Sequence, residues 1–217
     1  MKYYAIADLH GRYDLLEKSL DAITKHAPKD RDFKIITLGD YIDRGPDSAR
    51  IIKTLMGFQS FDGVEMVCLK GNHEDIMLQT IDQGMYREWW YSNGGMATVL
   101  SYDNYTVDKE HLDWVRNLPL YHETPGHVFV HAGIPDTDAP LEDQNHERLM
   151  WMLYGRDDPG GWQEKTVVHG HHIHEDGPHE WEYRTALDTG SFYTDRQVIG
   201  VFDDTQGRAI DFIEVKA

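Results

Sequence analysis

Cysteine is nearly absent from this sequence, because Cys68 is the only one among its 217 residues. A single thiol cannot form a disulfide within the chain, and it cannot supply the several thiolates of a structural zinc site. Cys68 lies in the mostly apolar stretch 64–69, where we expect it to be buried as a small hydrophobic side chain. The sequence therefore excludes a disulfide-stabilised scaffold and a thiolate zinc site.

Basic residues and long apolar runs are also scarce. The chain has 21 Lys and Arg against 38 Asp and Glu, for a formal net charge of −17. This charge repels phosphate backbones, so we expect no stable binding of nucleic acid. No run approaches the roughly 20 apolar residues of a membrane span, and the N-terminus shows no signal peptide. We expect a cytoplasmic protein without membrane contact.

The first half of the chain alternates short β-branched or aromatic runs with helical patterns. Strands are predicted over 2–7, 34–38 and 65–69, and helices over 12–26, 48–59 and 74–83. Such alternation favours parallel strands joined by crossover helices, with functional loops at the carboxyl ends of the strands.

The second half is predicted to be mostly sheet, after a further helix over 108–117. The predicted strands are 128–130, 166–168, 184–187, 197–202 and 209–215. We find no repeat, low-complexity tract or long linker, and the length suits one substantial core. We therefore predict a single domain over residues 1–217, with a helical insertion at about 75–125 that covers the site. The oligomeric state is left open.

Five short polar clusters follow predicted strands. They are Asp8-Leu-His10-Gly11, Gly39-Asp40-Tyr-Ile-Asp43-Arg44-Gly45, Gly71-Asn72-His73-Glu74, His131-Ala-Gly133 and Gly170-His171. Asp40 comes 32 residues after Asp8, and Asn72 comes 32 residues after Asp40, so one strand–loop–helix unit presents a polar group three times. Oxygen and imidazole ligands without sulfur suit manganese, iron or zinc. We expect a metal centre, with manganese preferred and iron or zinc as alternatives.

Together these clusters resemble the signature of the calcineurin-like metallophosphoesterases, and within them the bacterial and phage serine/threonine protein phosphatases. The resemblance runs from Asp8 to about Gly190. It implies an α/β fold in which a β-sandwich of two mixed sheets is flanked by helices, in four layers (α/β/β/α). It also implies two divalent metal ions, ~3.5–4 Å apart, with a bridging hydroxide that attacks phosphorus in line.

The resemblance assigns a role to each polar residue. Asp8 and His10 would bind the first metal, Asp40 would bridge both metals, and Asn72, His131 and His171 would complete the second. His73 would donate a proton to the leaving group, and Asp43 would orient it. Arg44, Arg156 and Asn72 would bind the substrate phosphate. As an alternative, Arg44 could simply form an ion pair with Asp43 or Asp47 and bind no phosphate. The spacing from Trp151 to Arg156 is one residue longer than the family pattern.

The tract His169–His174 offers several ligands, of which the resemblance selects His171. Ile173 stands where many relatives have the second histidine of Gly-His-x-His, which favours the protein phosphatase branch over the nuclease and cyclic-nucleotide branches. His172 or His174 remains open as a ligand that replaces or supplements His171. Further along, Asp188-Thr-Gly190 matches a late family motif, but the following Ser-Phe-Tyr-Thr departs from it.

The resemblance favours a serine/threonine protein phosphatase that acts on phosphorylated proteins or small phosphoesters. The alternative is a symmetrical dinucleoside tetraphosphate (diadenosine tetraphosphate) hydrolase, a sister group that shares the metal motifs. A pocket that stacks bases and carries cations would distinguish it, and the chain has many aromatic but few basic residues between Glu74 and His131. A third interpretation is a phosphate-binding scaffold that has lost turnover.

Overall fold

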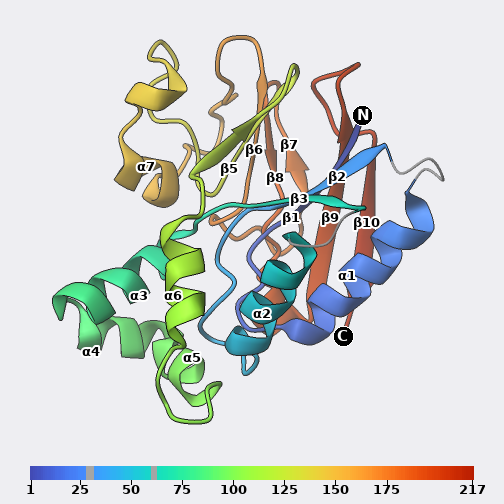
Figure 1. The fold of residues 1–217 in the computed structure, drawn as a ribbon. Helices are drawn as coiled ribbons and strands as arrows, with labels where there is room; N and C mark the ends of the chain where they lie inside the picture. Colours follow the sequence, from blue (N-terminus) through green and yellow to red (C-terminus); the bar gives the residue numbers. More distant parts are fainter. Residues whose placement is uncertain (28–31, 60–62) are drawn as a thin grey trace.

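The computed structural model describes residues 1–27, 32–59 and 63–217. Two five-stranded sheets pack face to face, and helices lie on their outer sides (Figure 1). Each sheet contains both parallel and antiparallel pairs. The predicted α/β fold with two mixed sheets flanked by helices is therefore confirmed.

The first sheet has the strand order β10-β9-β1-β2-β3. Its strands are β1 (Lys2–Ile6), β2 (Phe33–Thr37), β3 (Glu65–Cys68), β9 (Arg196–Asp203) and β10 (Asp211–Lys216). The pairs β1–β2 and β2–β3 are parallel, as the alternation of strands and helices predicted. β1 is buried on both faces, with Tyr4 and Ile6 packed toward the helices and Tyr3 and Ala5 toward the second sheet.

Two helices cover the outer face of the first sheet: α1 (Tyr13–His26) and α2 (Ser48–Gln59). Apolar residues of both, including Leu16, Ile23 and Ile51, belong to the same buried cluster as Tyr4 and Ile6 of β1. The predicted helices over 12–26 and 48–59 are confirmed to within a residue.

The second sheet has the order β4-β5-β6-β8-β7. Its strands are β4 (Tyr121–Glu123), β5 (His127–Val130), β6 (Thr166–His169), β7 (His179–Glu180) and β8 (Arg184–Ala186). A 3-10 turn, η2 (Leu141–Asp143), and a short helix, α7 (His146–Trp151), pack Leu141 and Leu149 against its outer face. β4, β7 and α7 were not predicted, because elements of two to six residues are too short to show a period.

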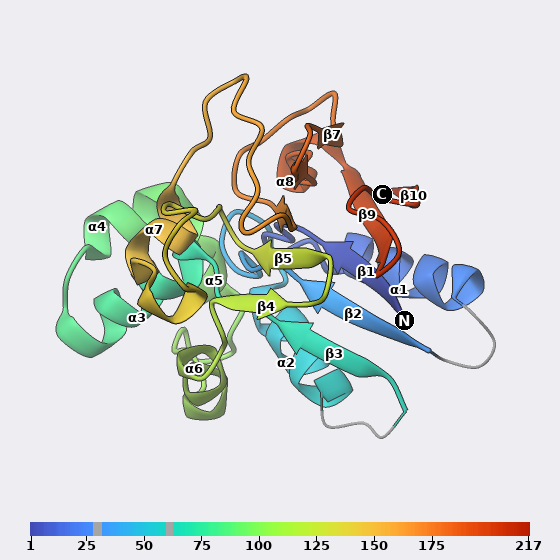
Figure 2. The same ribbon diagram turned by 90° about the horizontal axis from the view of Figure 1, so that it is seen from above.

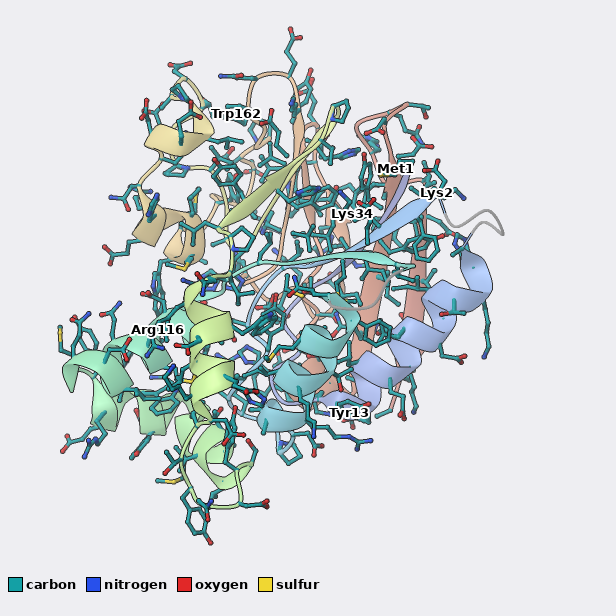
Figure 3. All side chains as sticks on the ribbon, viewed as in Figure 1. Met1, Lys2, Tyr13, Lys34, Arg116 and Trp162 are labelled. Carbon is teal, nitrogen blue, oxygen red and sulfur yellow. The ribbon has the colours of Figure 1, made fainter. Side chains whose placement is uncertain are left out.

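The helices that lie between β3 and β4 in the chain gather on one side of the molecule, away from both termini (Figures 1 and 2). They are α3 (Asn72–Gln83), α4 (Arg87–Trp90), the π-helical turn η1 (Tyr91–Gly95), α5 (Met96–Leu100) and α6 (Lys109–Arg116). Arg116 of α6, labelled in Figure 3, donates to Asp82 of α3 at 2.6 Å and ties two of these helices together. No helix within the described part of the chain is long and apolar enough to cross a membrane.

Candidate metal centre

The loops after β1 and β2 hold three polar residues in unusual backbone conformations. Asp8, His10 and Asp40 have φ values of 24°, 40° and 53°. Each is only 2% exposed. A side chain in this left-handed region costs about 1–3 kcal/mol, and such strain is concentrated at functional sites. These three loop residues therefore adopt strained backbone conformations, and their side chains line the same cavity.

The structure brings ligand atoms into two groups that share Asp40. The ligand atoms of His10, Asp40 and His73 lie within 4.8 Å of one another, and so do those of Asp40, His131 and His171. Oδ2 of Asp40 is 3.5 Å from Nε2 of His10, and Oδ1 is 3.5 Å from Nε2 of His131. The arrangement is consistent with a binuclear metal site.

Hydrogen bonds leave the histidine nitrogens ready to bind metal. Nδ1 of His10 bonds to the carbonyl of Ile42, and Nδ1 of His131 bonds to the carbonyl of Leu38, each at 2.8 Å. A carbonyl only accepts, so Nδ1 carries the proton in both rings and Nε2 keeps its lone pair. Burial lowers the pKa of both histidines, which keeps them neutral. Oδ1 of Asn72, the oxygen predicted to bind metal, lies 2.7 Å from Nε2 of His131. This donor set fits a divalent cation.

Asp8 lines the same cavity and lies beside His171 and Asp188, but it belongs to neither of the two groups. The backbone N–H of His171 donates to both carboxylate oxygens of Asp8 at 3.1 Å. Burial, with Asp188 and Asp40 nearby, raises the pKa of Asp8, and burial raises the pKa of Asp188 to about 6. A divalent cation would relieve the repulsion among these carboxylates. Gly170 permits the contact, because a Cβ there would lie 2.0 Å from Oδ1 of Asp8.

His73 and Asp43 form a buried pair next to this centre. Nδ1 of His73 lies 2.6 Å from Oδ2 of Asp43. Asp43 also accepts from Nε1 of Trp90 at 3.0 Å and from the hydroxyl of Thr98 at 2.6 Å. Burial opposes the charged imidazolium, but the charges of Asp40 and Asp43 outweigh it and raise the pKa of His73. The pair can therefore hold a proton on His73.

Arg44 reaches the centre from the same loop as Asp43. Its Nη1 is 2.7 Å from Nε2 of His10, and its Nη2 is 3.3 Å from Nε2 of His73. The ring of Phe192 packs on the guanidinium at 4.4 Å. Phe192 belongs to the segment that departs from the family pattern. The guanidinium points into the centre and not toward Asp43 or Asp47.

The tract from His171 to His174 divides between two cavities. His171 and Ile173 line the small cavity of about 140 Å³ that contains the candidate ligands. His172 and His174 line a separate cavity together with Arg156. The structure therefore places neither His172 nor His174 at the metal centre. Arg156 lies away from the centre as well, and its role as a second phosphate ligand stays a prediction.

Glu74 is a residue of the site to which the sequence analysis assigned no role. Its carboxylate accepts from the backbone N–H groups of Asp40, Tyr41 and Gly71 at 2.8, 2.9 and 2.9 Å. It thereby joins the loop after β2 to the loop after β3. The signal was present in the cluster Gly71-Asn72-His73-Glu74, but only the structure shows which N–H groups it holds.

An aromatic cavity of about 490 Å³ adjoins the metal centre. It is lined by Tyr86, Trp89 and Trp151, with Asp75 and Glu147 as its charged residues. Trp89, Trp151 and Ile76 line the metal-centre cavity too. The rings of Trp89 and Trp151 have centroids 5.7 Å apart, and 42% of Trp89 is exposed. A planar group could therefore stack next to the centre.

Comparison with known proteins relates this arrangement to a family. A family model described as calcineurin-like phosphoesterase matches residues 1–202. A symmetrical bis(5'-nucleosyl)-tetraphosphatase of Nitrosococcus oceani is 29% identical over 190 residues, covering 77% of this chain and 63% of the relative. The chain thus spans less than two thirds of that relative's length.

Two solved structures share the fold. A candidate diadenosine tetraphosphatase superposes with a TM-score of 0.71 at 21% identity, covering 99% of this chain and 93% of the other. A serine/threonine phosphatase of Saccharomyces cerevisiae superposes with a TM-score of 0.60 at 16% identity, covering 100% of this chain and 80% of the other. At these identities the likeness extends to the fold alone.

Proposed function

Because the chain belongs to the calcineurin-like phosphoesterase family, we propose that it is a metal-dependent hydrolase of symmetrical dinucleoside tetraphosphates. The observation that carries this proposal is the aromatic cavity that shares Trp89 and Trp151 with the metal centre. The sequence analysis ranked this activity second, behind a protein phosphatase. The named relative and the aromatic cavity reverse that order.

The proposed metal ligands are those that the resemblance assigned. Asp8 and His10 would hold one ion, Asn72, His131 and His171 the other, and Asp40 would bridge them. When bound, two such ions lower the pKa of a coordinated water and neutralise the phosphoryl oxygens. Manganese is the expected ion, and iron and zinc are the alternatives.

The chain's own residues would supply the remaining chemistry. His73, held by Asp43, would protonate the departing phosphate oxygen. Oδ2 of Asp43 lies 2.6 Å from Nδ1 of His73 and therefore favours the charged form of this imidazole. Nε2 of His73 is then the nitrogen that faces the centre. Arg44 would bind two phosphoryl oxygens with its planar fork, and Asn72 would contribute its amide.

The aromatic cavity would bind a nucleoside of the substrate. Stacking of a base on an aromatic side chain contributes about 1–3 kcal/mol, and every base has a face that can stack. Asp75 and Glu147 repel phosphate, so the base and not the phosphate chain would lie against them. The polyphosphate would then extend toward Arg44 and the metal ions.

A second candidate is the serine/threonine protein phosphatase activity that the sequence analysis favoured. The phrase Asp40-Tyr-Ile-Asp-Arg-Gly-Pro46, close to the protein phosphatase form, supports it. Such a substrate needs no base-stacking surface, so the aromatic cavity would have no part in binding it.

Initial rates on two substrates decide between these candidates. With Mn²⁺ supplied, we expect faster hydrolysis of diadenosine tetraphosphate, with ADP as the product, than of a phosphothreonine peptide. The opposite ranking would establish the second candidate. A protein that binds metal but hydrolyses neither these substrates nor p-nitrophenyl phosphate would be a phosphate-binding scaffold.

A further inference from the structure

A second cavity shares the loop 170–174 with the metal centre but lies apart from it. It measures about 550 Å³ and is lined by His172, His174, Trp181 and Arg184, with Arg156 and Tyr154 beside them. Apart from Arg156, whose role as a ligand of the substrate phosphate stays a prediction, no residue of this cavity has a role in the proposed function.

Arg184 is a buried charged residue that lines this cavity, and it is 1% exposed. Its Nε and Nη2 atoms are buried and have no hydrogen-bond partner among the described residues. The rings of Trp181 and Tyr154 pack on the guanidinium, with centroids 3.5 and 4.5 Å from Cζ. A buried charge without a partner is costly.

The unpartnered atoms form the edge with which arginine binds oxyanions. Nε and Nη2 project their hydrogens in the same direction, and this fork matches two oxygens of a phosphate or carboxylate. The nearby carboxylate of Asp158 accepts from the backbone N–H of Gly160 at 2.9 Å, and among the described residues it forms no hydrogen bond with Nε or Nη2 of Arg184. Arginine's own geometry therefore points to an anionic ligand.

Two histidines of the same cavity also have unpartnered nitrogens. Nδ1 of His172 and Nε2 of His174 are buried without partners in the described part of the chain. Their rings lie 4.7 Å apart. Nε2 of the neighbouring, fully buried His169 also has no hydrogen-bond partner among the described residues. An imidazole N–H can donate to an oxyanion, so these rings add donors beside Arg184.

The acidic groups of this cavity lie at its rim. Asp176 is bonded to Nε2 of His179 at 3.0 Å, and its side chain is 85% exposed. Asp157 also lines the cavity. Among the described residues, no carboxylate forms an ion pair with Arg184, so an entering anion would not displace one.

We propose that this cavity binds a phosphate oxyanion through the Nε and Nη2 edge of Arg184 and the nitrogens of His172 and His174. The oxyanion could be orthophosphate or the terminal phosphate of a nucleotide, because both present the same oxygens. The proposal does not depend on which phosphoester the metal centre hydrolyses.

Equilibrium dialysis of the metal-loaded protein against radiolabelled orthophosphate tests the proposal. We expect two equivalents to bind, one at the metal centre and one in this cavity. His174→Asn and Arg184→Lys should weaken the second equivalent by roughly 10- to 100-fold, the effect of one charge-assisted hydrogen bond. Both should retain the first equivalent and the metal content of the parent.

Arg50→Gln is the matched control, because the guanidinium of Arg50 also packs on an aromatic ring, that of Tyr13, at 3.6 Å. It should bind two equivalents like the parent. His174→Asn keeps the test decisive if Arg184→Lys does not fold. Competition by AMP at the second equivalent alone would identify a nucleotide as the source of the phosphate.

Three results would overturn the proposal. The parent could bind a single equivalent, the second equivalent could survive both substitutions, or metal analysis could find that the second cavity binds a cation in place of phosphate.

Discussion

Buried contacts fix the position of the His73 ring. It is 4% exposed, and its partner Asp43 receives hydrogen bonds from both Trp90 and Thr98. These contacts fix the ring and its Nδ1 proton, so Nε2 is the nitrogen that can exchange a proton with a substrate.

His73→Asn should lower turnover by roughly 10²–10⁴ and leave the metal content intact. The loss should be largest for substrates with poor leaving groups, because these most need protonation. The measurement is kcat for a series of aryl phosphates with leaving groups of different pKa. His111→Asn, a buried histidine of α6 that bonds to Tyr102, is the control. An equal loss for every leaving group would rule out His73 as the acid.

Trp89→Ala should raise KM for diadenosine tetraphosphate by roughly 5- to 100-fold, the value of one stacked base. KM for glycerol 2-phosphate should stay the same, because this substrate has no planar ring to place in the aromatic cavity. Trp114→Ala, which removes a tryptophan bonded to Gln59, is the control. Equal changes in KM for both substrates would show that Trp89 does not bind a nucleoside.

The loops that follow the strands, more than the strands themselves, carry the strain of the site. Asp43 and Arg44 have φ values of 72° and 69°. The turn η1 packs against this loop, since the backbone N–H of Arg44 donates to the carbonyl of Gly94 at 3.2 Å. Helices α4 and α5, on either side of η1, contribute Trp90 and Thr98 to the same loop. The helices after β3 therefore support the position of Arg44.

Gly94→Ala should lower the free energy of unfolding by about 1–3 kcal/mol and reduce kcat. Gly94 has a φ of 106°, and a Cβ there would lie 2.5 Å from the backbone nitrogen of Arg44. Gly57→Ala is the matched control, because Gly57 lies in α2 with open space around it. It should raise stability by roughly 0.5–1 kcal/mol. Urea denaturation measures both, and equal stability of the two variants would contradict the close contact.

The two sheets of the molecule meet at the metal centre. Asp8, His10 and Asp40 come from loops of the first sheet, whereas His131 and His171 follow β5 and β6 of the second. A cation bound by both sets of ligands would therefore link the two sheets. Metal binding should stabilise the whole fold, because the unfolded chain does not present these ligands together.

Adding Mn²⁺ to the chelator-treated protein should raise its melting temperature. At a free concentration 100 times Kd, one site contributes about 2.7 kcal/mol. Asp40→Asn should lose most of this effect and disturb both metals, whereas Asp211→Asn, an exposed carboxylate on β10, should behave like the parent. Calorimetry with metal analysis measures both. An Asp40→Asn protein that binds two ions normally would refute the bridging role.

The parallel strands β1, β2 and β3 and the polar clusters after them were predictable from the sequence. A buried strand followed directly by Asp, His or Asn is a local pattern, and parallel strands bring such clusters to one edge. The order of the two proposed activities was not predictable in this way, because the aromatic cavity behind it depends on Trp89 and Trp151, which are 62 residues apart and meet only in the fold.

By itself the sequence determined the candidate ligands, the family they resemble and the chemistry they favour, because each depends on neighbouring residues. The tertiary structure decided which side chains share a cavity. In the structure His171 lines the metal-centre cavity, whereas His172, His174 and Arg156 line another one. Glu74 joins the loop after β2 to the loop after β3. The physical reason is that side-chain direction depends on the backbone torsions of a loop and on packing partners far along the chain, and neither is encoded in a local pattern.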